Sequence, residues 1–232
     1  SLMWDLYPSI LEPSDVNYIK ARISLLVKKL NNDKESALNG VIQYDSAEYS
    51  NKGSKITLES ICTAIKSENL FGVVEGILDK NEIKIKREET FYEVFKDYFD
   101  SIKALNPEHW DRKEKTKNLL RSNQGIGAFV KLHKEILKYL DKKDLFNPTS
   151  KNNNVKEWYS KMLEPVSVLI KGLKTTEEIK KFKRIGEGGK QQIFVDFVKT
   201  INKSFSEGNN DILKKSGAKY CILHCCKGDI CK

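Results

Sequence analysis

The chain has 232 residues, 39% of them hydrophobic, so it is long enough to bury one large core or two smaller ones. Lys and Arg total 41 against 32 Asp and Glu, which gives a net charge of +9 and a pI of about 9.1. This balance favours an anionic partner such as nucleic acid, although a coding bias towards Lys, Asn and Ile explains it equally well. No apolar run reaches the roughly 18 residues of a membrane span, and the N-terminus lacks the features of a signal peptide. We therefore expect a soluble, cytoplasmic protein with no membrane partner.

The first part of the chain predicts two helices separated by a short strand. Apolar spacing predicts a helix over residues 16–30, with Ile19 on its buried face and Ser14 or Asp15 as its cap. Residues 41–44 read as a strand between Gly40 and a polar loop. Thr57 is expected to cap the next helix. The apolar run 70–78 contains two glycines and fits a turn, a strand or a broken helix.

The rest of the chain predicts four helices. Residues 88–105 carry an aromatic face, and residues 126–140 carry an apolar one. Beyond the loop 141–154, residues 155–173 and 189–205 also have helical spacing. The predicted fold is mainly α, or α+β at most: a multi-helix globular domain with one or two short strands. The loop divides it into a helical subdomain over 1–145 and another over 155–232, or lies within a single domain. Ser1 and Leu2 before Met3 resemble a cloning scar, as in a piece cut from a longer protein.

The first candidate site precedes the helix at 126–140. Side-chain donors are supplied here by Arg121, Ser122 and Asn123, just ahead of Gly125 and Gly127. The first backbone N–H groups of the predicted helix point toward the same place. Helix N-termini attract anions, so this turn is a candidate phosphate cradle. The alternative is a capped helix whose glycines permit close packing.

The second candidate site is another glycine-rich turn before a helix. It contains three cations and three glycines: Lys183, Arg184, Gly186, Gly188, Gly189 and Lys190. Backbone N–H groups freed by glycines beside cations can form a phosphate nest. A lysine-rich surface turn is the alternative. The two turns together predict an anion site if the fold brings them close.

The C-terminal tail offers weak candidates for metal ligands, namely Cys221, His224, Cys225, Cys226 and Cys231. Their number would suit tetrahedral zinc, but their spacing does not form the usual paired knuckles, so buried or free thiols are the simpler reading. The chain has no nucleotide-binding or catalytic motif, and no cofactor is expected. His133 lies between apolar helix positions and is expected to be structural.

Four stretches together resemble the later part of DGQHR-domain proteins, which include Dnd-type regulators of DNA phosphorothioate modification. The stretches are residues 26–45, 55–65, 104–137 and the "GEGG" of 186–189. The motif that names the family is absent, and in the family it lies N-terminal to the part that resembles this chain. The resemblance implies turn residues at Asn31 and Gly40, and a second turn at Gly186 and Gly189. It also implies that Arg121, Gly125 and Gly127 are positions of the family's sequence pattern, ahead of a core helix.

The resemblance also implies the expected function. This is a DNA-associated, non-catalytic or regulatory module of a bacterial DNA-modification or defence system, with proteins of that system as partners. One alternative is the remnant of a nuclease-like or nucleotide-hydrolysing enzyme whose N-terminal motif is missing. The other is a helical protein-interaction domain whose positive charge reflects only coding bias.

Overall fold

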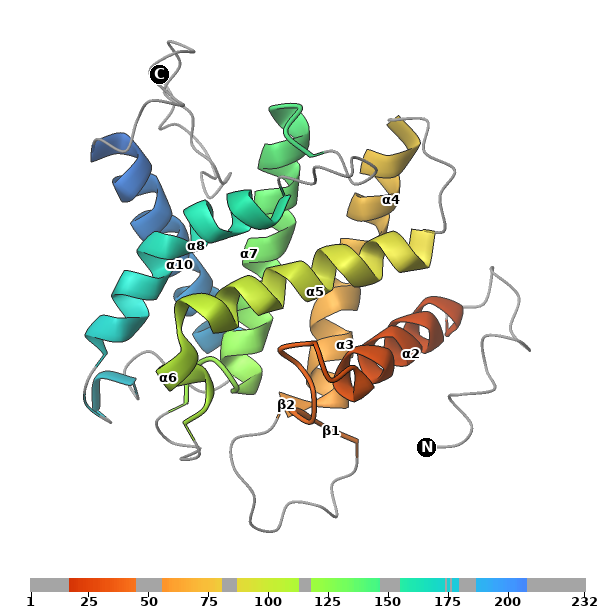
Figure 1. Ribbon diagram of the computed structural model, residues 1–232, viewed down its shortest axis with the longest axis horizontal. Coiled ribbons are helices and arrows are strands. Elements are labelled where there is room, and N and C mark those ends of the chain that lie inside the picture. The colour runs from red at the N-terminus through yellow and green to blue at the C-terminus, as the bar shows by residue number, and fades with distance from the viewer. Residues whose placement is uncertain are drawn as a thin grey trace.

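A computed structural model describes residues 17–44, 56–80, 87–112, 118–146, 155–173, 175, 177–179 and 187–207. Most of these residues are helical, which confirms the prediction of a mainly α fold. The elements, shown in Figure 1, are α2 (Tyr18–Asn32), β1 (Ile42–Gln43), β2 (Ile56–Thr57), α3 (Leu58–Ser67), α4 (Leu70–Lys80), α5 (Arg87–Leu105), α6 (Pro107–Trp110), α7 (Asn123–Lys142), α8 (Val155–Gly172) and α10 (Glu187–Glu207). Among the helices described, none combines the length and apolarity that a membrane crossing requires.

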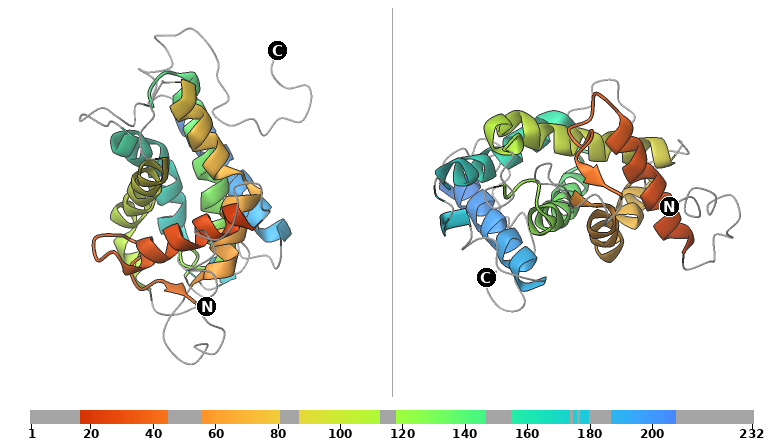
Figure 2. Two further views of the ribbon diagram at one scale, coloured as in Figure 1. Left: turned by 90° about the vertical axis from the view of Figure 1, so that its right-hand side faces the viewer. Right: turned by 90° about the horizontal axis from the view of Figure 1, so that it is seen from below.

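Helix α7 lies in the middle of the molecule. Helices α3, α4 and α10 pack against it, while α5 packs against α8 and α2 lies against α3 and α5 (Figures 1 and 2). The apolar face predicted for this helix is buried throughout, at Ile126, Phe129, Val130, Leu132, Ile136, Leu137 and Leu140. Because α7 is surrounded by other helices, most of its side chains are buried and constrained by packing.

The predicted aromatic face of α5 is confirmed as the second large element of the core. Phe91, Phe95 and Phe99 are buried at successive turns, and the Phe91 ring stacks on Phe71 of α4 at 4.0 Å between centroids. Offset aromatic pairs of this kind add stability beyond the area they bury. Helix α4 is continuous through both of its glycines, which resolves the ambiguity of residues 70–78.

The start of α2 differs in one respect from the prediction. The predicted caps, Ser14 and Asp15, lie outside the described residues, and the helix begins at Tyr18. Ile19 is 47% exposed, so its predicted burial is wrong. The core contacts of α2 begin later, at Ala21 and Ile23, and the first turn projects beyond the core.

Two short parallel strands join α2 to α3. Ile42 pairs with Ile56, and Gln43 pairs with Thr57. The cap predicted for α3 is confirmed, since Thr57 Oγ1 accepts a hydrogen bond from the Ser60 N–H at 3.3 Å. Of the one or two short strands expected, the sequence pattern places only the first, because β2 runs directly into the helical pattern of α3.

Residues on both sides of the 141–154 loop share one core. The Tyr159 ring on α8 meets the Tyr98 ring on α5 edge to face, with centroids 5.2 Å apart. The Ser167 hydroxyl on α8 donates a hydrogen bond to the Leu105 carbonyl at 3.0 Å. Helix α10, which also follows the loop, packs on α7, which precedes it. The described parts of the two predicted subdomains therefore form one hydrophobic cluster.

Candidate functional site

The first turn of α7 uses two of the side chains proposed as anion donors for its own structure. Ser122 caps the helix: its Oγ accepts a hydrogen bond from the Gly125 N–H at 3.1 Å and donates one to the Leu119 carbonyl at 2.7 Å. Asn123 Oδ1 accepts a hydrogen bond from the Thr57 N–H at 3.1 Å. Both side chains therefore hold the fold together, and the second ties β2 to α7.

Arg121 lies just before this turn and is half-buried. Its Nη1 donates a hydrogen bond to the Trp110 carbonyl at 3.4 Å, and its backbone N–H donates one to Asn118 Oδ1 at 2.8 Å. Burial lowers the pKa of the Arg121 guanidinium, and the negative charge of Asp111 acts in the opposite direction. Arg121 thus stabilises the connection between α6 and α7.

The glycines of this turn permit close approach to neighbouring groups. A Cβ atom at Gly125 would lie 1.9 Å from the Leu119 carbonyl oxygen, so no other residue fits there without rearrangement. A Cβ atom at Gly127 would lie 2.8 Å from Cδ of Lys190, a residue in the first turn of α10. The fold therefore brings the starts of α7 and α10 together.

Part of the second glycine turn can be placed. In the first turn of α10, Gly188 is exposed and Gly189 is buried. The remaining residues of this candidate site, Lys183, Arg184 and Gly186, lie outside the described residues. A hydrogen bond of 3.0 Å from Lys131 Nζ to Gln191 Oε1 joins α7 to α10 beside the turn.

The candidate metal ligands of the tail, Cys221, His224, Cys225, Cys226 and Cys231, all lie outside the described residues. Within the described ranges, no group of three His, Cys, Asp or Glu side chains is arranged to hold a metal ion. Cys62, on α3, is buried, and this burial raises the pKa of its thiol to about 12. It is therefore a neutral core side chain, not a nucleophile.

His133 lies inside the core, on α7. Its Nε2 is 2.8 Å from the Tyr159 hydroxyl, and its ring stacks on Tyr98 with centroids 4.1 Å apart. Burial lowers the pKa of His133 to about 3, so the imidazole is neutral. Its position between three helices gives it a structural role.

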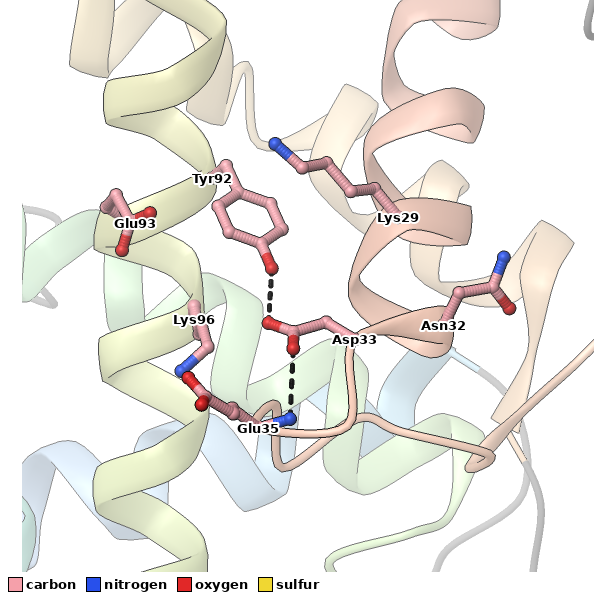
Figure 3. Close-up of a pocket in the computed structure, with 7 residues that line it drawn as sticks. All are labelled: Lys29, Asn32, Asp33, Glu35, Tyr92, Glu93 and Lys96. Atoms are coloured by element: carbon pink, nitrogen blue, oxygen red, sulfur yellow. Dashed lines mark hydrogen bonds between the residues drawn. The ribbon is translucent and has the colours of Figure 1, made fainter.

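A surface pocket of about 620 Å³ opens between α2 and α5, and it is shown in Figure 3. Its lining residues are Lys29, Asn32, Asp33, Glu35, Tyr92, Glu93 and Lys96. The Asp33 carboxylate accepts hydrogen bonds from the Tyr92 hydroxyl and from the Glu35 N–H, the latter at 2.9 Å. Lys29 Nζ lies 4.1 Å from the centre of the Tyr92 ring. Sequence patterns missed this group because its two halves are 59 positions apart.

Several polar groups of the pocket bond to one another or to nearby residues. Desolvation and the Asp33 carboxylate both raise the pKa of the Tyr92 phenol, which therefore stays protonated. Lys96 Nζ donates to Asp100 at 2.9 Å, and the other oxygen of that carboxylate accepts from the Ala37 N–H at 2.7 Å. This arrangement fastens the loop after α2 onto α5 and supplies no activated nucleophile or base.

Beside the C-terminal half of α2, the partly exposed Lys28 lies next to the exposed aromatic ring of Tyr44. Tyr44, at the end of β1, is 40% exposed, and Lys28 Nζ lies 6.0 Å from its ring centre. Lys29 and Lys34 are exposed in the same segment. We call residues 17–44 the basic segment, since they hold five Lys and Arg against two Asp and Glu. The local excess of positive charge is visible in the sequence and is a signal for this segment. The sequence pattern identifies Tyr44 only as a residue of the predicted strand.

A scan against protein-family models, a search of curated proteins and a search of solved structures each find no match to this chain.

Proposed function

We propose that this chain is a non-catalytic module that binds DNA through its basic segment. The observation that carries the proposal is the local excess of positive charge there, five basic side chains against two acidic ones. Asp33 stays charged, because hydrogen bonds from Tyr92 and the Glu35 N–H lower its pKa, and the basic side chains still outnumber the acidic ones. The field of the segment therefore favours phosphate groups.

The geometry supports binding without sequence readout. Lys29 and Lys34 are exposed, and Lys28 is half-exposed at the end of α2. Lysine acts as a point charge for phosphates, so contacts of this kind give affinity and a strong dependence on salt but little base preference. The resemblance to DGQHR-domain proteins favours DNA as the nucleic acid and a regulatory role in a DNA-modification system.

The pocket between α2 and α5 supports a role in binding over a role in catalysis. Its tyrosine is held protonated, and the carboxylate of Asp33 accepts hydrogen bonds from Tyr92 and from the Glu35 N–H. A general base must instead be free to take a proton near neutral pH. On this proposal, the pocket residues keep α2 and its loop in place for DNA.

A second candidate function is nucleotide binding at the starts of α7 and α10. The observation that favours it is the contact of Lys190 with Gly127, which brings two glycine-rich helix starts together. A thermal shift with ATP and magnesium would support it, and Lys190→Gln should then abolish the shift. No shift with any nucleotide would exclude it.

The DNA proposal is tested by two variants that lose the same number of positive charges from different parts of the surface. The triple variant Lys28→Gln, Lys29→Gln, Lys34→Gln removes three charges from the basic segment. The control triple Lys138→Gln, Lys156→Gln, Lys171→Gln removes three exposed charges from α7 and α8. We expect the first variant to weaken binding of a labelled duplex at least tenfold, and the control by no more than about threefold. Equal losses would show that the charge acts only through its overall sum.

A further inference from the structure

Tyr44 is one of four large hydrophobic side chains that are exposed among the described residues. It directly follows β1 and lies beside the C-terminal half of α2, within the basic segment. An aromatic ring exposed next to cations is the arrangement by which proteins hold single-stranded nucleic acid, because every base has a face that can stack.

The Tyr44 ring is held in one position. Its hydroxyl accepts a hydrogen bond from Asn31 Nδ2 at 2.8 Å and donates one of 3.5 Å to the Lys28 carbonyl. Asn31 is itself buried, and its Oδ1 accepts a hydrogen bond from the Ile42 N–H at 2.8 Å. The ring is therefore fixed before a ligand arrives, which reduces the entropy lost on binding.

We propose that Tyr44 stacks on an unpaired DNA base while Lys28 contacts a phosphate of the same strand. The inference rests on the proposed function and narrows its substrate to single-stranded DNA. In a duplex the faces of internal bases are covered by their neighbours, so the ring adds affinity only where bases are unstacked. The phosphate contact alone is available to both forms of DNA.

The hydrogen bonds of Tyr44 also tie β1 to α2, and two substitutions separate that role from stacking. Tyr44→Phe keeps the ring and removes the hydroxyl. Tyr44→Leu keeps an apolar side chain and removes the aromatic face. Both variants lack the hydroxyl, so both should lower the melting temperature. Only Tyr44→Leu also lacks the aromatic face, so only this variant should lose affinity for single strands if the ring stacks on a base.

The experiment measures fluorescence anisotropy of the full chain with labelled oligo(dT) of about 20 nucleotides and with a duplex of equal length, at about 0.1 M salt. We expect Tyr44→Leu to bind the single strand roughly tenfold more weakly and the duplex unchanged, and Tyr44→Phe to stay within about threefold of wild type for both. Equal single-strand affinity for wild type and Tyr44→Leu would overturn the inference. If the Lys28, Lys29, Lys34 triple still weakened both ligands, the proposed function would stand without it.

A second measurement needs no variant. Oligo(dT) carrying 5-iodouracil crosslinks to aromatic side chains that stack on the base, and mass spectrometry locates the attached residue. We expect the main crosslink at Tyr44 in the wild-type chain. Crosslinks confined to other residues would overturn the inference, and absence of binding to either form of DNA would overturn the proposed function as well.

Discussion

The hydroxyl of Tyr92 on α5 donates a hydrogen bond to the carboxylate of Asp33, the residue that ends α2 (Figure 3). The same carboxylate accepts a second bond from the Glu35 N–H. One acidic side chain thus joins α5 to the loop that leads from α2 to β1. The position of the proposed DNA-binding segment depends on this junction.

The Asp33 junction predicts a stability difference that changes with pH. Hydrogen bonds from Tyr92 and the Glu35 N–H lower the pKa of Asp33 in the folded chain. A carboxyl of this kind stabilises the fold above its unfolded pKa of about 3.9, and the contribution is lost as pH falls through the folded pKa. Asp33→Asn should lower the urea midpoint at about pH 7, and the difference from wild type should shrink below about pH 4.

The control for the junction is Tyr92→Phe. It removes the donor and leaves the carboxylate, so Asp33→Asn should have a smaller effect in this background than in wild type. A difference between Asp33→Asn and wild type that stayed constant down to about pH 3 would contradict the assignment.

The buried imidazole of His133 predicts a second pH effect in a different range. Its pKa is lowered to about 3 in the fold, while that of an unfolded histidine is about 6.5. Between these values the unfolded chain binds a proton that the folded chain does not, so the free energy of unfolding decreases as pH falls. Between about pH 7 and pH 5.5, wild type should lose about 1 kcal/mol more stability than His133→Gln, measured by urea unfolding. Parallel losses would mean that His133 is protonated in the fold.

The close approach at Gly125 predicts a large cost for one methyl group. Gly125→Ala would place Cβ 1.9 Å from the Leu119 carbonyl oxygen, and we expect a loss of about 3 kcal/mol in the free energy of unfolding. Gly76→Ala is the matched control, because a Cβ atom there meets nothing within 4 Å inside α4. It should gain about 0.5–1 kcal/mol from helix propensity. Similar effects at the two glycines would refute the packing at the start of α7.

The hydrogen bonds of Asn31 hold β1 against α2, so substituting this residue should lower the free energy of unfolding. Asn31→Ala would leave the buried Ile42 N–H without its acceptor and Tyr44 without its donor, at a cost of about 2 kcal/mol. Asn39 is the control, since it is exposed and makes one bond of 3.1 Å to the Asn31 carbonyl. Asn39→Ala should change the free energy of unfolding by less than about 0.5 kcal/mol, as surface substitutions do. Equal effects of the two alanines would contradict the central role of Asn31.

The features that the sequence could predict are those with a local cause. The aromatic face of α5 repeats at Phe91, Phe95 and Phe99 because every turn of the helix meets the core, so its period is visible in the sequence. The Thr57 cap is also local, since donor and acceptor are three residues apart. Gly40 has a left-handed φ of +62°, as in a turn, but the expectation of a turn at Asn31 is wrong, because Asn31 lies in the last turn of α2.

The candidate site could not be predicted in the same way because it depends on contacts between distant parts of the chain. Asp33 and Tyr92 show no shared pattern, and only the packing of α2 against α5 brings them together. At the start of α7, the Ser122 hydroxyl accepts a hydrogen bond from the Gly125 N–H and the Asn123 side-chain oxygen accepts one from the Thr57 N–H, and the sequence alone does not show these contacts. The residue types in a turn do not show which of their polar atoms form hydrogen bonds within the folded chain.

The most direct test of the account is the salt dependence with which the unmodified chain binds single-stranded DNA. If the basic segment contacts phosphates, the logarithm of the association constant should fall with the logarithm of salt concentration, with a slope of about −2 or steeper between roughly 0.05 and 0.2 M. The triple substitution of Lys28, Lys29 and Lys34 should make that slope shallower by about 2. A slope near zero, or no binding at the lowest salt, would contradict the proposal that this chain binds DNA through the phosphate contacts of its basic segment.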